Sequence, residues 1–189
     1  MLTDVRTRHT STWDESLKPI GEGTFDKEPF EEWWARNQSR LANLDQLVAE
    51  QWVYRHWRHS PFAHLPLERM TCREEEWITE RILRDIDWGL PEWDDDPEFN
   101  HGVFHGKDSE PGRSMDATDT WNIPPVVLGA PGGLLTDTGE RPERHYWLVE
   151  GRQRRRYLHA LASRCEGAGR PDAVHKIIIV RIGGEPTLP

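Results

Sequence analysis

The stretch YWLVEGRQRRRY at residues 146–157 decides the fold of this chain. Its first half, together with the preceding His145, predicts a strand over residues 145–149, and Gly151 then leads directly into a helix that runs to about residue 165. A glycine at such a corner lets the backbone turn sharply and lets a ligand approach it closely. The stretch therefore predicts a strand–turn–helix unit.

The segments on either side of this unit complete a small mixed sheet. Residues 123–128 predict a short strand entered through two prolines, PGG at 131–133 and TGE at 138–140 are turn signals, and residues 175–182 predict a closing strand. The order strand, hairpin-like loop, strand, helix, strand is typical of the α+β class. Strand and helix periods place one set of apolar side chains inward, which we expect to form a single buried cluster: Leu148, Leu158, Leu161, Ile177 and Ile179.

The first hundred residues predict an α-helical region rich in tryptophan. Residues 29–57 carry aromatic and aliphatic side chains at helical spacing, and Thr71 opens a capping-box pattern that predicts a second helix over 71–87. Residues 1–28 are polar and without periodicity, which predicts a flexible N-terminal arm. We therefore expect an arm (1–28), an acidic helical region (29–100) and an α+β core (101–189). Because each helix is too short to be stable alone, residues from 29 onwards should form one compact body.

Residues 89–122 predict a long loop. Asp94-Asp95-Asp96, His101 and His105 lie in it, and aspartate and histidine are residues that bind metals. Their spacing matches no ligand pattern, so a solvated loop is the better interpretation and no metal site is predicted.

Charge and cysteine content restrict the function further. The chain has 189 residues and a net charge of −9, which argues against DNA binding by the whole surface. Residues 1–100 hold 12 basic and 22 acidic side chains, whereas residues 101–189 hold 12 and 11. Cys72 and Cys165 lie far apart and favour reduced thiols over a disulfide. We find no signal peptide and no apolar run that could span a membrane, so a cytoplasmic protein is expected.

Four arginines, Arg152, Arg154, Arg155 and Arg156, open the helix after Gly151. A helix N-terminus carries about half a positive charge, so cations there are unfavourable by a few tenths of a kcal/mol or more each. A bound anion reverses this effect, because the dipole, the backbone amides and the guanidinium groups then attract it together. The alternative is that the arginines point into solvent and pair with the acidic first half.

At this point the sequence resembles the core of the ParB/sulfiredoxin-like superfamily. The resemblance covers residues 123–182: PPVVL, a glycine-rich turn, YWLVEGRQRRRYLHAL and IIIVR. In that superfamily a Gly-x-x-Arg turn holds nucleotide or DNA phosphate. The resemblance implies that Gly151 is the corner and Arg154 the phosphate-binding arginine, with Arg155 of lesser importance. It implies a phosphate-binding turn made of six consecutive residues: Gly151, Arg152, Gln153, Arg154, Arg155 and Arg156.

The sequence also departs from the pattern of this superfamily. Many members have Glu, His or Cys where this chain has Arg152, and Arg or His where it has Gln153. Sulfiredoxin activity is excluded, because the required cysteine is absent. Glu150 is the nearest carboxylate and is the one candidate catalytic residue. If the chain is an enzyme, NTPase or nuclease-type phosphoryl transfer is expected, with Asp137 or Glu140 helping Glu150 to place a metal.

The sequence is therefore compatible with two functions. The first is a ParB-like protein that binds nucleotide or nucleic-acid phosphate, with a nucleoside triphosphate and Mg²⁺ as the cofactors to consider. By analogy, such cores occur in mobile-element and phage-defence systems. The second is an acidic interaction protein of the immunity-protein or antitoxin type. In that case Trp88, Trp93 and Asp94-Asp95-Asp96 would cap a basic protein partner.

Overall fold

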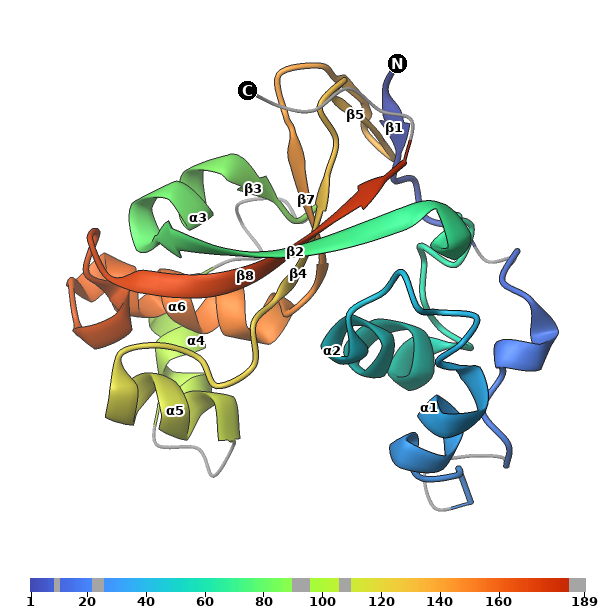
Figure 1. Ribbon diagram of the computed structural model, residues 1–189. Helices are drawn as coiled ribbons and strands as arrows, with labels where there is room; N and C mark the ends of the chain where they lie inside the picture. Colours follow the sequence, from blue (N-terminus) through green and yellow to red (C-terminus); the bar gives the residue numbers. More distant parts are fainter. Residues whose placement is uncertain (9–10, 22–25, 90–95, 106–109, 184–189) are drawn as a thin grey trace.

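The computed structural model describes residues 1–8, 11–21, 26–89, 96–105 and 110–183 (Figure 1). The expected α+β class is confirmed. A five-stranded mixed sheet has the spatial order β2 (Met70–Ile78), β8 (Val174–Ile182), β4 (Val126–Gly129), β7 (Tyr146–Glu150) and β3 (Ile86–Asp87). A second sheet has the order β1 (Thr3–Asp4), β5 (Leu134–Thr136) and β6 (Gly139–Arg141).

The large sheet mixes parallel and antiparallel neighbours. Strand β8 is antiparallel to β2 and parallel to β4, and β7 is antiparallel to β4 and parallel to β3. The helices are α1 (Phe30–Asn37), α2 (Gln46–Val48), α3 (Thr79–Asp85), α4 (Pro97–Phe104), α5 (Glu110–Thr118) and α6 (Arg152–Arg164). A π-helical segment, η2 (Ala49–Tyr54), continues α2. Three short 3-10 turns are η1 (Glu15–Leu17), η3 (Leu67–Arg69) and η5 (Gly167–Gly169).

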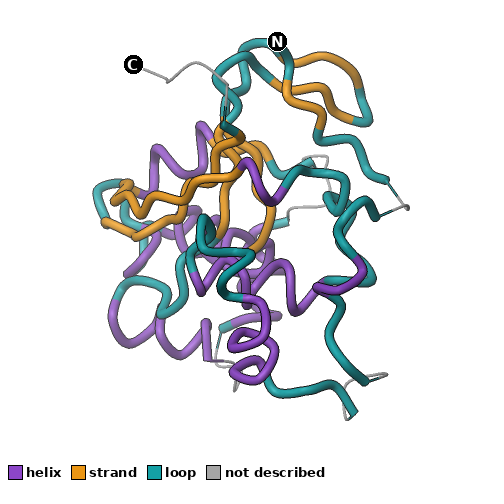
Figure 2. Tube along the Cα trace, turned by 45° about the vertical axis from the view of Figure 1, so that its right-hand side comes forward, coloured by secondary structure: helices purple, strands orange, loops and turns teal. Residues whose placement is uncertain are grey.

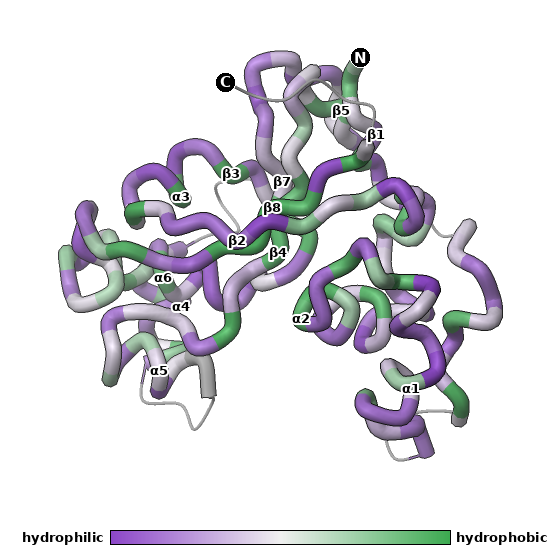
Figure 3. Tube along the Cα trace, viewed as in Figure 1, coloured by the Kyte–Doolittle hydropathy of each residue, from purple (hydrophilic) through white to green (hydrophobic). Residues whose placement is uncertain are grey.

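The two faces of the large sheet are covered by different helices (Figure 2). Alternate residues of a strand point to opposite faces, so Ile177 and Ile179 lie on one side and Ile178 on the other. The first side packs against α6, and the five residues expected to share a buried cluster do so, which confirms that prediction. Hydrophobic residues therefore gather in the centre of the sheet, where β8, β4 and β7 lie side by side (Figure 3).

The second side of the sheet is covered by the tryptophan-rich region. Trp33 and Trp52 are almost completely buried in the same cluster as Val180 of β8. Strands β2 and β3 also come from the first hundred residues and hydrogen-bond to β8 and β7. The two halves of the sequence are therefore interleaved in one sheet.

The structure differs from the prediction at residues 70–78, which form strand β2 and not the start of a helix. Only Thr79–Asp85 of the expected helix over 71–87 is helical. The capping-box pattern at Thr71 is local, whereas β2 pairs with β8 along its whole length, and Lys176 Nζ lies 2.8 Å from Glu74 Oε1 across the pair. Tertiary pairing outweighs the weak local preference.

The expected helix over 29–57 is interrupted. Helix α1 ends at Asn37, and the next helix begins only after Asp45, whose side chain accepts a hydrogen bond from the Leu47 amide at 2.8 Å. Leu41 and Leu44 lie in the connection and are buried, so their helical spacing reflects burial rather than a continuous helix.

The expectation of a long loop over 89–122 is wrong in part, because α4 and α5 lie within it. The Asp96 carboxylate caps α4 by accepting from the amides of Glu98 and Phe99, at 2.9 and 3.1 Å. Asp-Pro at the start of a helical run is a recognisable start signal. His101 and His105 stack on each other, with ring centres 4.6 Å apart. Trp93, Asp94 and Asp95 lie outside the described residues.

The N-terminal segment is attached to the body at several points. Strand β1 pairs with β5, Trp13 is buried and its Nε1 donates to the Leu65 carbonyl at 3.0 Å. The carbonyl of Leu17 accepts a hydrogen bond from Trp33 Nε1 at 2.7 Å. Isolated aromatic contacts of this kind leave no periodic pattern in the sequence, so residues 1–28 give no local signal of them.

Candidate phosphate-binding site

The corner between β7 and α6 requires glycine. Gly151 has φ of +110°, a conformation that side chains rarely adopt, and a Cβ at this position would lie 2.7 Å from the Cβ of Pro125. The first amides of a helix have no partner within it, so α6 presents N–H groups at this corner. The first intrahelical bond runs from the Arg155 amide to the Gly151 carbonyl, at 3.0 Å.

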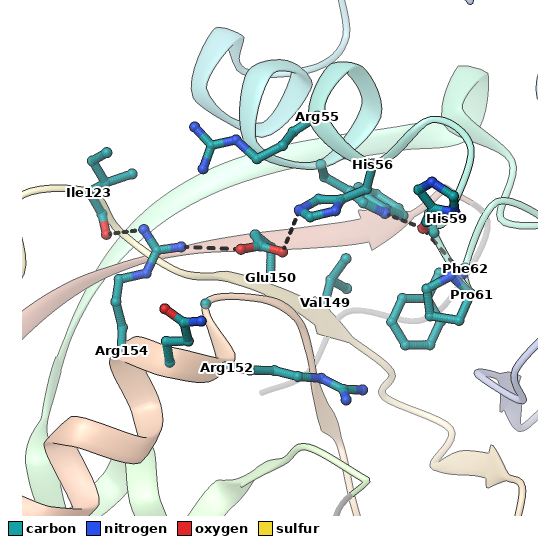
Figure 4. A pocket seen from close by; sticks show the side chains of 14 residues that line it. Arg55, His56, His59, Pro61, Phe62, Ile123, Val149, Glu150, Arg152 and Arg154 are labelled. Atoms are coloured by element: carbon teal, nitrogen blue, oxygen red, sulfur yellow. Dashed lines mark hydrogen bonds and ion pairs between the residues drawn. The ribbon is translucent and has the colours of Figure 1, made fainter. Parts of the chain in front are cut away.

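A cavity of about 550 Å³ opens at this corner (Figure 4). One wall is the end of β7 and the first turn of α6, from Val149 to Arg154. The opposite wall comes from the tryptophan-rich layer: Arg55 and His56 at the end of its helix, and the turn that follows at residues 59–62. We call it the α6 cavity. It lies where the two layers on opposite faces of the sheet meet.

Arg154 is built into the floor of the α6 cavity. Its side chain is 9% exposed. Nη1 donates to the Ile123 carbonyl at 3.0 Å, and Nη2 donates to Gln51 Oε1 at 2.7 Å. Burial lowers the pKa of Arg154 to about 10, with the carboxylate of Glu150 opposing this and the charge of Arg55 adding to it. The guanidinium remains charged at neutral pH and is held in one position.

Glu150 is held between two basic groups. Its Oε2 lies 3.2 Å from His56 Nε2, and its Oε1 lies 3.8 Å from Arg154 Nη2. Burial acts to raise the pKa of Glu150, but contacts with His56, Arg154 and the Gly151 amide outweigh it, so the pKa lies below the ordinary value. Glu150 is therefore an ionised carboxylate, which suits a counter-charge or metal ligand better than a proton donor.

Arg55 and Arg152 line the α6 cavity in a different way from Arg154. Both are exposed, and neither makes a hydrogen bond or an ion pair with any residue that the structure describes. The pKa of Arg152 is lowered, first by burial and then by the charge of Arg156. Two cations facing a cavity without a carboxylate of their own are available to an anionic ligand.

Arg155 and Arg156 are not among the residues that line the cavity. Their guanidinium carbons lie 4.1 and 5.7 Å from the ring centre of Trp88, on another side of the helix. The structure thus places Gly151, Arg152, Gln153 and Arg154 at the cavity and separates the last two arginines of the expected turn from it.

The expected metal-placing partners of Glu150 also lie elsewhere. Asp137 accepts hydrogen bonds from the Thr7 amide and hydroxyl, and Glu140 is on β6 of the small sheet. Within the described ranges no three His, Cys, Asp or Glu side chains form a group that could hold a metal ion. Mg²⁺ often binds through one carboxylate plus substrate phosphates. Glu150 fits that mode only together with a phosphate ligand, so Mg²⁺ and a nucleoside triphosphate remain proposals.

The wall of the α6 cavity that residues 51–62 contribute was not predicted from the sequence. Gln51 is 2% exposed and joins Arg154 to the Pro124 carbonyl, to which its Nε2 donates at 3.2 Å. A glutamine in an otherwise apolar helical stripe was a signal of a buried polar contact. The run RHWRH at residues 55–59, basic within an acidic half, was the signal for Arg55 and His56.

Comparison of the chain with protein-family models, with curated proteins and with solved structures gives no match. Among the described residues, no helix is long and apolar enough to cross a membrane.

Proposed function

We propose that this chain is a ParB-like protein that binds the phosphate of a nucleotide or nucleic acid in the α6 cavity. The observation that carries this proposal is that Arg55, Arg152 and the N-terminus of α6 line one cavity, and that neither arginine forms a hydrogen bond or ion pair with the described residues. Backbone amides, helix dipole and guanidinium groups then act on the same anion.

The three arginines of the α6 cavity have different roles in this proposal. Arg55 and Arg152 approach the phosphate from opposite walls and supply the contacts that change on binding. Arg154 is already bonded to Ile123 and Gln51, so it contributes a fixed positive charge and holds the two layers together. Glu150 orients His56 and offers one carboxylate to a metal that arrives with the phosphate.

The alternative of an acidic interaction protein makes the arginine turn an internal partner of carboxylates. Arg152 does not support it, because its guanidinium forms no hydrogen bond or ion pair with a carboxylate among the described residues, although the charge of Glu150 acts on it. Glu150, the carboxylate nearest in sequence, lies between His56 and Arg154 instead. This contrast favours phosphate binding.

The test is calorimetric titration with pyrophosphate, thymidine monophosphate, ATP with and without Mg²⁺, and short single- and double-stranded DNA. Loss of one charge-assisted contact should weaken binding about ten- to a hundredfold, the equivalent of about 1.5–3 kcal/mol, in Arg152→Ala and Arg55→Ala. Arg73→Ala is the matched control, because Arg73 is an exposed arginine of β2 outside the α6 cavity.

Binding should also raise the melting temperature of the wild-type protein, and above the dissociation constant the rise should grow with the logarithm of ligand concentration. If none of these ligands binds the wild type or shifts its melting temperature, the phosphate-site proposal fails. The acidic interaction protein is then the better account.

A further inference from the structure

A second basic cavity adjoins the α6 cavity. It has a volume of about 350 Å³ and is lined by Lys18, Lys27 and Arg58, together with Arg55 and His59, which also line the α6 cavity. We call it the lysine cavity. Its residues lie outside the stretch that resembles the ParB/sulfiredoxin-like core.

Arg55 couples the two cavities electrostatically. Its charge lowers the pKa of Arg154 on one side and of Lys27 on the other, in each case in addition to the larger effect of burial. The positive charges around the two cavities repel one another. A ligand that carries several negative charges reduces this repulsion in both cavities at once.

The two lysines of the lysine cavity differ: one is held in place, and the other is available to a ligand. Lys27 Nζ donates to the Tyr54 carbonyl at 2.5 Å and lies 3.8 Å from the Tyr54 ring centre. Lys18 is exposed and makes no hydrogen bond or ion pair through its side chain with the residues that the structure describes. Glu28, the acidic group that acts on Lys27, is itself bonded to Arg36 and to the Ile20 amide.

We propose that the two cavities form one continuous binding track for a single-stranded oligonucleotide, with one phosphate in the α6 cavity and a following phosphate in the lysine cavity. This inference rests on the proposed function and names its ligand class. A single strand can bend so that successive phosphates follow a concave basic path, as in proteins that bind single strands without reading sequence. With a net charge of −9, the rest of the surface repels a polyanion and confines it to the track.

The test compares fluorescein-labelled thymidine monophosphate with labelled oligothymidylates of two, four and eight nucleotides, by fluorescence anisotropy with the full chain. Affinity should rise about tenfold or more from the mononucleotide to the tetranucleotide, because a second charge-assisted contact is gained. Double-stranded DNA of equal length should bind more weakly than the single strand.

Binding by single-residue variants shows which cavity holds which phosphate of the ligand. Lys18→Ala should remove most of the gain with length and leave mononucleotide binding unchanged. Arg55→Ala should weaken both ligands, and Arg73→Ala should weaken neither. The slope of log K against log salt for the tetranucleotide should decrease by about 0.7 in Lys18→Ala, the value expected for one phosphate contact to a single strand.

The two proposals fail in distinguishable ways. If the mononucleotide binds with dependence on Arg152 but length brings no gain, or if Lys18→Ala changes nothing, the track is refuted and the single phosphate site stands. If neither mononucleotide nor oligonucleotide binds, the proposed function itself is refuted.

Discussion

The two sides of the first turn of α6 carry arginines in different environments. On one side Arg154 is buried among Ile123, Gln51 and Glu150, beneath a cavity. On the other side Arg155 lies over the ring of Trp88. Both residues belong to one run of identical side chains, so the difference comes from the side of the helix on which each lies and from the layer that faces that side. A basic run is therefore a set of separate sites, and each arginine takes its role from what faces it.

The largest loss of stability is expected for a substitution of Gly151, the corner that positions both sides of the first turn of α6. Gly151→Ala should destabilise the protein by about 2–4 kcal/mol, since a positive φ and overpacking against Pro125 both contribute. The measurement is urea unfolding followed by circular dichroism. Gly139→Ala is the control: its φ is +118°, but nothing lies within 4 Å of its added Cβ, so about 1–2 kcal/mol is expected. Equal losses in the two variants would refute the role of Pro125.

The next effect separates the buried arginine from its exposed neighbour. Arg154→Met should cost about 1.5–3 kcal/mol of unfolding free energy, because Gln51 and the Ile123 carbonyl lose a charged donor. Arg152→Met should change stability by less than about 0.5 kcal/mol, as expected for a surface substitution. The measurement is chemical unfolding of the two variants, which compares their free energies of unfolding with that of the wild type. A loss in Arg152→Met as large as that in Arg154→Met would contradict the division of roles.

A smaller effect is expected on the Trp88 side. Arg155→Met should cost about 0.5–1 kcal/mol, the usual size of a cation–π contact near the surface. Phosphate affinity in the titration should stay at the wild-type value, because Arg155 does not line the cavity. A tenfold loss of affinity in this variant would mean that the ligand lies on both sides of the turn.

The smallest effect concerns Glu150 and acid stability. A carboxyl group whose folded pKa lies below its unfolded value contributes stability that is present above the unfolded value, near 4.5, and is lost as pH falls through the folded pKa. Glu150→Gln should remove this contribution, so the stability of the variant should fall less steeply than wild type below pH 4.5. Burial opposes the shift, so the difference should be small. Parallel curves for the two proteins would show that His56 and Arg154 do not stabilise the carboxylate.

Much of the C-terminal part of the fold was predictable from the sequence. The strand at β7, the corner at Gly151, helix α6 and strand β8 follow from periodicity and from a glycine that stands between them. The buried cluster that includes Leu158 and Ile177 also follows, because helix and strand periods each define an inward face. These are local properties of the chain, and they determine where the N-terminus of α6 lies.

Only the tertiary structure decided what faces that helix. Pairing with β8 turns residues 70–78 into a strand, although their local pattern favours a helix start. Packing of the tryptophan-rich layer brings Arg55 and Gln51 to α6 from about a hundred residues earlier in the chain. The same packing buries Arg154 and leaves Arg152 exposed. Such contacts depend on non-local burial and hydrogen bonding, which no short stretch of sequence contains, and they convert an arginine run into a cavity with one fixed and two available cations.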